Sequence, residues 1–374
     1  MKQYLKDCAN TMLMKFNQML VRSRARDWSL KIEAAVGGPD LQAATNIQRF
    51  CGEVNFFYED FNLPEQLRIG GAWKKDLLER RKHQMRTYKT KSTTEIAEFH
   101  EQMFYNELIY GIWHFGYLND LKLGLNSQID FAREIQSYFG MFGHDNVIYP
   151  QTPIGHWGMV SKRNSVEKPI RMSDVSHAMQ AAHIKDLVTY QSKRDSQRRL
   201  NFLEIGSGFG GLAHKLSTLS LFESIYLVDI PHNLATAYYY LSRTIGPDSA
   251  TIVGTNSQFD KAVSSSKPRI VLVPSCYYNR IKELKGPFIV GNFGSFSEMD
   301  IFTVNFYLAN LPYEVLSLIQ INSNLSSLNT GGHRECRVDD FTYPERLVRV
   351  YGGASSWKEC TVESRYKTAL HLSV

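Results

Sequence analysis

A glycine-rich turn between an apolar run and a helical segment constrains this chain more than any other feature. Residues 200–213 have the pattern of a buried strand, a turn with Gly206, Gly208 and Gly210, and the start of a helix. Glycines in such a turn let a ligand approach the backbone where side chains would block it. The spacing of Gly206, Gly208 and Gly211 also fits the dinucleotide fingerprint G-x-G-x-x-G, so the glycines alone do not identify the ligand.

Glu204, two residues before the first glycine, distinguishes the candidate ligands. Its carboxylate would face the pyrophosphate of a dinucleotide, where like charges repel. The same carboxylate suits S-adenosylmethionine, which carries an ammonium and a sulfonium but no phosphate. The motif therefore predicts an S-adenosylmethionine site. The alternative is a surface strand, turn and helix with incidental glycines.

A second apolar run, Ser224 to Asp229, ends in an acid. In nucleotide-binding folds the second strand carries an acid about 20 residues after the glycine turn, and this acid binds the ribose hydroxyls. Asp229 fits that role, and a solvent-facing aspartate at a strand end is the alternative. Pro231 then suits the first turn of a following helix.

The composition is that of an ordinary globular protein, with 43% hydrophobic and 21% charged residues. The length of 374 residues suggests two domains or one enlarged domain. Five scattered cysteines without a C-x-x-C pair favour reduced thiols and argue against a cysteine-based zinc site. No signal peptide or membrane span is recognisable, so we expect a cytoplasmic protein. The net charge of +6 permits an anionic substrate, and we expect no nucleic-acid partner.

Residues 1–195 are expected to form a mainly helical N-terminal or cap region, because their apolar residues recur at helical spacing. Residues 146–170 contain three prolines and two glycines and are expected to be a loop on the acceptor side. Ser173 offers an N-cap for a helix that runs to about Tyr190. A polar run then leads into a second domain, residues 196–374.

From residue 200 onward, short apolar runs alternate with helical segments. Three further runs are residues 270–273, 288–292 and 316–321, while Thr251 to Gly254 is left unassigned. This alternation predicts an α/β fold with a mostly parallel sheet covered on both faces. Ligands on such sheets bind at the carboxyl ends of the strands. Five candidate residues fall at those ends: Glu204, Asp229, Ser275, Cys276 and Asn292.

Four segments resemble, in order, the sugar O-methyltransferase family of bacterial class I methyltransferases. They are Leu203–Ala213, Leu227–Pro231, Val273–Ser275 and Asn292–Met299. The resemblance covers roughly residues 195–325 and implies a Rossmann-like class I methyltransferase sheet. It also implies S-adenosylmethionine as cofactor and a sugar hydroxyl as acceptor, in surface-polysaccharide or glycan biosynthesis.

The resemblance implies a role for each matching residue. The glycine turn would pass close to the methionine moiety of the cofactor, with Glu204 near its ammonium, and Asp229 would hold the ribose. Ser275 and Cys276 would border the adenine, although the family usually has an aromatic residue after Pro-Ser. Asn292 would lie near the sulfonium.

Methyl transfer to a hydroxyl calls for a positioned base, because an alcohol is a weak nucleophile at neutral pH. Glu298 is the first candidate, since it follows the fourth strand of this domain on the side that faces the cofactor. Its alternative role is a helix-start carboxylate that interacts with backbone N–H groups. His333, in a glycine-flanked loop after the next strand, is the second candidate, and its alternative is a solvated loop histidine.

The sequence constrains the acceptor and the partners less than it constrains the cofactor. His156 and Trp157 are candidates for the acceptor pocket, because aromatic faces stack on sugar rings, and a loop aromatic that fills a gap is the plainer alternative. The adjacent acids Asp339 and Asp340 are expected in a surface loop, so no required metal is predicted. The basic segment 74–86 suits phosphate groups, a lipid-linked glycan or a membrane surface, or it is a solvated helix face.

Three functions therefore remain open. The first is O-methylation of a sugar or glycan that is free, nucleotide-linked or lipid-linked. The second keeps the cofactor but changes the acceptor to a small natural product or RNA. The third is a non-catalytic methyltransferase-like binding module. The large N-terminal region serves equally well as a lid or as a homodimer contact.

Overall fold

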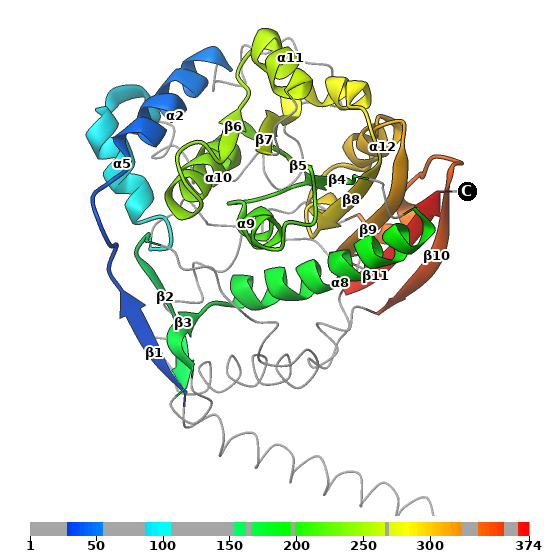
Figure 1. Cartoon of the computed structure of the whole chain (residues 1–374), viewed down its shortest axis with the longest axis horizontal. Coiled ribbons are helices and arrows are strands. Elements are labelled where there is room, and N and C mark those ends of the chain that lie inside the picture. The colour runs from blue at the N-terminus through cyan, green and yellow to red at the C-terminus, as the bar shows by residue number, and fades with distance from the viewer. Residues whose placement is uncertain are drawn as a thin grey trace, which may run out of the picture.

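A computed structural model of the chain has a large twisted sheet with helices on both of its faces (Figure 1). It describes residues 28–54, 87–105, 153–161, 166–195, 199–265, 269–323, 336–354 and 366–373. The sheet has eight strands in the spatial order β10-β11-β9-β8-β4-β5-β7-β6. Their bounds are β4 Asn201–Ile205, β5 Ser224–Asp229, β6 Ala250–Ile252, β7 Arg269–Pro274, β8 Phe288–Phe293, β9 Val315–Ser323, β10 Leu347–Ala354 and β11 Tyr366–Ser373.

The pairing of these strands confirms the predicted α/β class. Strands β6, β7, β5, β4, β8 and β9 pair in parallel, whereas β11 is antiparallel to both β9 and β10. This order is that of a mostly parallel, Rossmann-like sheet, in which β6 is an edge strand. The unassigned segment at Thr251 supplies part of β6. Strand order reverses at β4, so a crevice is expected at its carboxyl end.

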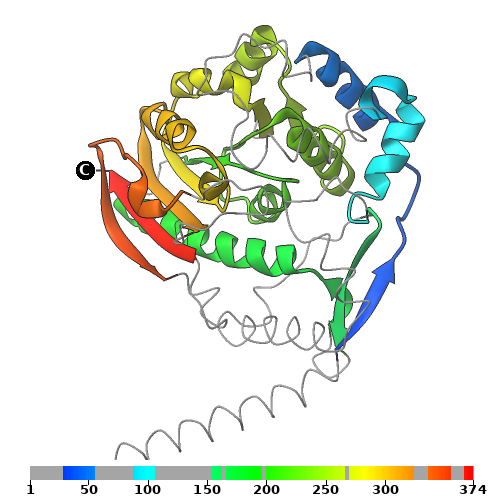
Figure 2. The same cartoon turned by 180° about the vertical axis from the view of Figure 1, so that it is seen from behind.

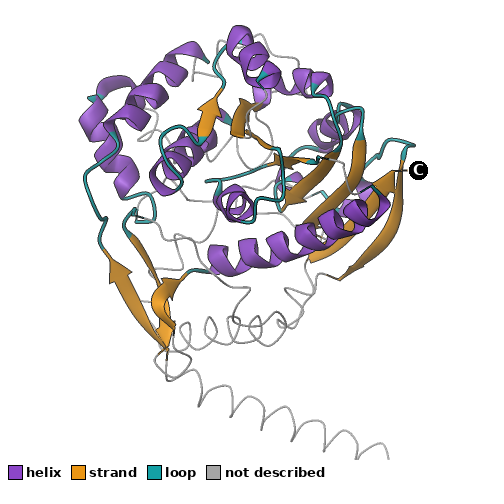
Figure 3. Ribbon diagram, in the orientation of Figure 1, coloured by secondary structure: helices purple, strands orange, loops and turns teal. Residues whose placement is uncertain are grey.

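Two helical layers cover the sheet, as Figure 3 shows. One layer contains α8 (Met172–Arg194), α9 (Gly211–Thr218) and α10 (Pro231–Thr244), and its apolar residues share a core with Phe202 and Leu227. The other contains α11 (Asn256–Ser264), the 3-10 helix η4 (Ser275–Glu283) and α12 (Ile301–Ala309), around Leu203 and Val228. Alternate residues of each strand therefore enter different cores.

The segment 146–170, which was expected to be a loop, contributes two strands to a small antiparallel sheet. This sheet consists of β1 (Trp28–Glu33), β2 (His156–Ser161) and β3 (Val166–Ile170), in that spatial order. Two strands thus lie where we expected a loop, because β1, far away in the sequence, supplies the pairing partner for β2. Figure 2 shows this sheet beside the start of α8.

Helix α8 also differs slightly from the expectation. Arg171, rather than Ser173, is its N-cap, and the helix continues to Arg194. The side chain of Asp174 accepts a 2.9 Å hydrogen bond from the backbone N–H of Arg171, which closes the first turn. Residues 1–27 of the expected helical N-terminal region lie outside the described residues.

Helices α2 (Leu41–Glu53) and α5 (Thr93–Glu101) pack with α10, and one apolar core joins them to the large sheet. Arg243 of α10 forms an ion pair with Glu101, and the Tyr239 hydroxyl donates a 2.7 Å hydrogen bond to the same carboxylate. The described part of the N-terminal region is therefore built onto the sheet. No helix in the described ranges is both long and apolar enough to cross a membrane.

Candidate functional site

Two carboxylates lie at the ends of the neighbouring strands β4 and β5. Glu204 pairs in register with Leu227, two residues before Asp229. By strand alternation Glu204 lies on the same face as Phe202, and Asp229 on the same face as Leu227. Phe202 and Leu227 share the core under α8, α9 and α10. Both carboxylates therefore lie on this face, at the carboxyl edge where sequence analysis placed the site.

Glu204 is almost fully buried and lacks a matching charge among the described residues. Its side chain is 4% exposed, and its Oε2 atom has no hydrogen-bond partner there. Burial, and secondarily the charge of Asp229, raise the pKa of Glu204 well above its usual 4.5. A buried polar atom without a partner costs stability, so the geometry favours a ligand that brings a donor or a positive charge to Glu204.

Asp229 shapes the glycine turn. Its Oδ2 accepts a 2.7 Å hydrogen bond from the backbone N–H of Gly208. Its Oδ1 accepts from the N–H of Ile230 at 2.7 Å and from the amide of Asn233 at 2.9 Å. Asp229 therefore joins the turn to the start of α10, and its contact with a ribose stays a prediction.

The glycines of the turn make room for other parts of the chain. Gly206, Gly208 and Gly210 all have positive φ, a region that favours glycine. A Cβ on Gly206 would overlap the hydroxyl of Ser295, so the residue is required by packing within the protein as well as by its φ of +79°. Ser207, which sequence analysis did not single out, is 6% exposed, and its hydroxyl has no partner among the described residues. In the sequence, the position of Ser207 inside the glycine turn was the feature that could have marked it as a candidate site residue.

Asn292 lies on the opposite face from the two carboxylates and has a bracing role. Its fully buried amide donates to the carbonyl of Ile205 at 2.8 Å and to the hydroxyl of Ser295 at 2.6 Å. Its carbonyl accepts from the amide of Asn322 at 2.9 Å and from the N–H of Phe296 at 3.2 Å. Both ends of the Asn292 side chain are therefore occupied within the protein, and these contacts fix the end of β4. A role beside the sulfonium stays untested.

Ser275 and Cys276 follow β7, next to the carboxyl end of β5. Ser275 is buried and hydrogen-bonds Tyr307. Burial raises the pKa of the Cys276 thiol to about 12, so the thiol is protonated at neutral pH. The hydroxyl of Tyr277 donates a 3.0 Å hydrogen bond to the carbonyl of Gly254 and joins this loop to the end of β6. Both candidates lie at the expected edge, and their contact with an adenine stays a prediction.

Glu298 ends a 3-10 helix, η5 (Phe296–Glu298), that directly follows β8. Its backbone N–H donates to the carbonyl of Ser295 at 3.1 Å. The preceding residue, Ser297, donates its N–H to the side chain of Asn322 at 3.3 Å. The segment that carries Glu298 is thus anchored at the same edge as Glu204. The second candidate base, His333, lies outside the described residues.

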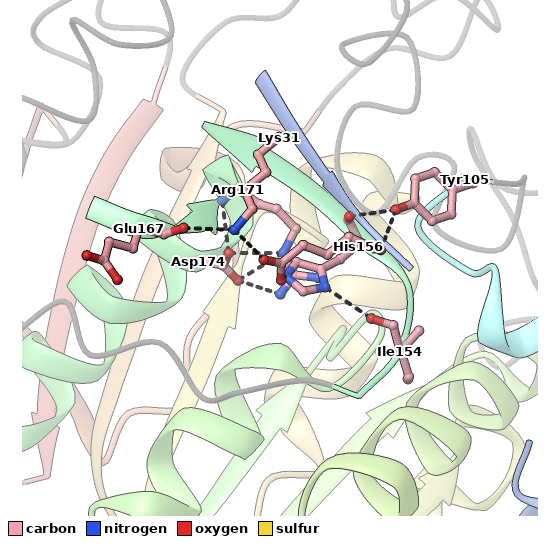
Figure 4. Close-up of polar contacts among 8 residues, drawn as sticks. Lys31, Tyr105, Ile154, His156, Glu167, Arg171 and Asp174 are labelled. Atoms are coloured by element: carbon pink, nitrogen blue, oxygen red, sulfur yellow. Dashed lines mark hydrogen bonds and ion pairs between the residues drawn. The ribbon is translucent and has the colours of Figure 1, made fainter. Parts of the chain in front are cut away.

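His156 and Trp157 belong to β2, and their polar atoms are used within the N-terminal region. Figure 4 shows His156 beside Ile154. His156 contacts the carbonyl of Ile154 at 3.1 Å and the carboxylate of Glu33 at 3.3 Å, and burial lowers its pKa. Trp157 is 5% exposed and donates its indole N–H to the carbonyl of Phe104 at 2.9 Å. Trp157 thus packs in the core from a strand rather than from the expected loop, and the contact of both residues with an acceptor stays a prediction.

A buried ion pair at the start of α8 was not anticipated. Arg171 donates to Asp174 at 2.6 Å (Figure 4). The guanidinium of Arg171 lies 4.0 Å from the centre of the Phe104 ring. One helical turn later, a Cβ on Gly211 would overlap the His177 ring. Burial lowers the pKa of His177 to about 4, so the ring is neutral at pH 7. Helix α8 is thus seated directly on the glycine motif.

The described residues contain no cluster of three or more metal-ligating side chains. Asp339 and Asp340 form ion pairs with Arg349 and Arg337 at distances of 2.7 and 2.9 Å. Both acids are exposed, as expected for a surface segment. The absence of a required metal stays an expectation.

Comparison with known proteins gives no family. No family model matches the chain, and no curated protein matches it. Magnesium protoporphyrin IX methyltransferase from Synechocystis PCC 6803 is 11% identical, over 64% of this chain and 98% of its own, with a TM-score of 0.31. A SAM-dependent methyltransferase from Anabaena variabilis is 12% identical, over 52% and 86%, with a TM-score of 0.31. The N-methyltransferase NodS from Bradyrhizobium japonicum is 15% identical, over 47% and 79%, with a TM-score of 0.29. At these TM-scores the alignments establish no function for this chain, and the site itself has to carry the assignment.

Proposed function

We propose that this chain is an S-adenosylmethionine-dependent methyltransferase that acts on a sugar hydroxyl. The observation that carries the proposal is the buried carboxyl group of Glu204, whose Oε2 has no partner among the described residues, beside Asp229 at the carboxyl end of β4. Two neighbouring acids suit a cationic ligand and oppose a pyrophosphate. The residues present therefore fit the proposed cofactor.

Each part of the site has a distinct task in this proposal. Glu204 binds the ammonium of the cofactor, and Asp229 holds the glycine turn in shape through Gly208. The bound cofactor supplies an activated methyl group on a sulfonium. The protein then mainly has to align the acceptor oxygen with that methyl group and to exclude water.

Glu298 is the proposed base that takes the proton from the acceptor hydroxyl. Its segment is anchored by Asn322 through the N–H of Ser297. A positioned base contributes typically about 10²–10⁴-fold to the rate. His333 is the second candidate for this role.

The sugar acceptor rests on the resemblance of Asn292–Met299 to sugar O-methyltransferases. A small natural product or RNA is the alternative acceptor class. The linkage of the sugar to a nucleotide or lipid is open, because the basic segment 74–86 lies outside the described residues.

Calorimetric titration with S-adenosylhomocysteine tests the cofactor assignment. We expect saturable binding by the native chain and at least tenfold weaker binding by Glu204→Ala. Asp248→Asn, which changes an exposed acid before the start of β6, at the edge of the sheet opposite to Glu204, is the matched control and keeps native affinity. An absence of binding heat would identify a non-catalytic module. Transfer of labelled methyl groups to RNA but not to glycans would overturn the sugar assignment.

A further inference from the structure

We propose that occupation of this site by a ligand with an amino group expels one proton from the carboxyl group of Glu204 into the solvent. The inference rests on the proposed function, because the ligand it considers is S-adenosylmethionine or its product. It adds a property that the cofactor assignment does not require, namely proton-coupled binding.

The two neighbouring carboxyl groups have unlike surroundings. Asp229 accepts hydrogen bonds from the N–H groups of Gly208, Ile230 and Asn233, which favours its ionised form. Oε2 of Glu204 accepts none among the described residues and is buried. Glu204 is buried and Asp229 is partly exposed, and two neighbouring carboxyl groups hold a single negative charge more readily than two. The proton therefore resides on Glu204 while the site is empty of a cation.

The elements packed around this face bring several titratable groups. They are Arg171 at the N-cap of α8, Asp174 and His177 on α8, His214 and Lys215 on α9, and His232 and Tyr240 on α10. Tyr307 of α12, on which the charge of Asp229 acts, and Cys276 of η4 belong to elements of the opposite layer.

The cations among these groups do not neutralise Glu204. Arg171 is bound to Asp174 at 2.6 Å. Burial lowers the pKa values of His177 and His214 to about 4, so both rings are neutral near pH 7. Among the described residues, the charge that acts on Glu204 is that of Asp229. The charge environment of Glu204 is therefore negative until a ligand arrives.

An incoming ammonium reverses this balance. Its positive charge favours the carboxylate, so the carboxyl group loses its proton and the ammonium keeps all of its own. The neutral carboxyl group becomes a carboxylate, and the released proton passes to the buffer. A ligand without an amino group leaves the proton in place.

Titration calorimetry in two buffers of different ionisation enthalpy counts this proton. At about pH 6, above the ordinary pKa of a glutamate, phosphate and imidazole buffers give different heats if protons are released. With S-adenosylhomocysteine we expect release of about one proton per site. With 5′-methylthioadenosine, which has the nucleoside but no amino acid, we expect none. Equal release with both ligands would overturn the inference.

Matched variants assign the proton to Glu204. Glu204→Gln keeps the shape of the side chain but has no proton to lose, so binding persists more weakly and proton release disappears. Asp300→Asn, a partly exposed acid at the start of α12, keeps the release. If Glu204→Gln does not fold, the native chain alone decides. The dissociation constant of the native chain for S-adenosylhomocysteine should fall about tenfold per pH unit between about pH 5 and 6.5, because binding releases a proton.

Failure of the proton coupling and failure of the proposed function give different results. Binding heat with no proton released by the native chain overturns proton coupling and leaves the cofactor assignment intact. No binding heat with S-adenosylhomocysteine in either buffer overturns the proposed function itself.

Discussion

Among single residues, Glu204 is expected to lower the stability of the ligand-free protein. Its folded-state pKa lies above its unfolded value, so the native state holds this proton more tightly than the unfolded state does. The stabilisation by this proton is complete at pH values below the ordinary pKa and is lost as pH rises toward the folded-state pKa.

Glu204→Gln should therefore raise the melting temperature of the ligand-free protein more at pH 8 than at pH 5. Glutamine stays neutral at both pH values, so the gain at pH 8 reflects the cost of ionising the buried carboxyl group, roughly 1–3 kcal/mol. Thermal unfolding of the variant and of the Asp248→Asn control at both pH values measures the difference. Equal gains at the two pH values would show that folding does not raise the pKa of Glu204.

A second substitution tests the packing of the turn. Gly206→Ala adds a methyl group at positive φ and also against Ser295, whereas Gly294→Ala adds one at positive φ in open space. A side chain at positive φ destabilises both variants by roughly 1–3 kcal/mol. Any further loss of unfolding free energy in Gly206→Ala, compared with Gly294→Ala, therefore measures the overlap with Ser295. Urea unfolding should show this excess, and Ser295→Gly in the same chain should remove part of it. Additive effects of the two changes would rule out the contact.

The sequence was sufficient to predict Glu204 and Asp229 as neighbours, because both close apolar runs that pair as adjacent parallel strands. It did not reveal the face on which Asn292 lies. Strand β8 is buried on both sides, so its residues give no polar alternation from which a face is deduced. The brace formed by Asn292 and Asn322 required the three-dimensional register of β8 and β9.

Among the elements, α5 and α10 are joined by a buried ion pair that fixes the N-terminal helices on the sheet layer. The Glu101 side chain is 9% exposed, and its partner Arg243 is 14% exposed. Tyr239 shares the same carboxylate and stacks on His100 at a ring-centre distance of 4.8 Å. Loss of Glu101 would leave both Arg243 and Tyr239 without this partner.

Glu101→Ala should destabilise the protein by roughly 3 kcal/mol, because it leaves a buried cation uncompensated. Glu223→Ala is the control, since its partner Arg199 is 80% exposed and such pairs contribute about 0–1 kcal/mol. Chemical denaturation of the two variants measures the contrast. Similar losses for both would mean that the α5–α10 ion pair does not hold the helices in place.

The strands of the small sheet could not be predicted from the sequence. Strands β2 and β3 lie in a segment whose prolines and glycines are typical of loops. The partner β1 precedes β2 by more than a hundred residues, with Trp28 opposite Ser161. Local patterns contain no information on such distant pairing, whereas the strands from β4 onward follow the regular alternation of an α/β unit.

In the whole molecule, the predicted division near residue 195 crosses a continuous core. Phe50 of α2, Ile96 of α5 and Phe202 of β4 belong to the same apolar cluster. The alternation of helices and strands in the sequence predicted the α/β fold of the second half. It could not predict a core shared with the N-terminal helices, because that core depends on tertiary contacts between distant segments. We therefore expect the described N-terminal helices and the sheet to unfold together.

Two cysteines provide probes of this cooperativity, one in each half. Cys51 in α2 packs against the shared core, and Cys276 follows β7 at the carboxyl edge of the sheet. Burial raises the pKa of both thiols, so in the native state both are protonated and react slowly with alkylating reagents. Unfolding exposes each thiol and returns its reactivity to that of a free cysteine.

Alkylation at increasing urea concentration, read by mass spectrometry of the two peptides, should give the same midpoint for Cys51 and Cys276. Equal midpoints are expected because a single cooperative transition removes the shared core in one step. Glu101→Ala, which weakens the α5–α10 contact, should lower both midpoints together. A lower midpoint for Cys51 alone would show that the N-terminal helices detach first. The boundary near residue 195 would then separate two folding units, and α2 and α5 would act as a cap that opens independently of the sheet.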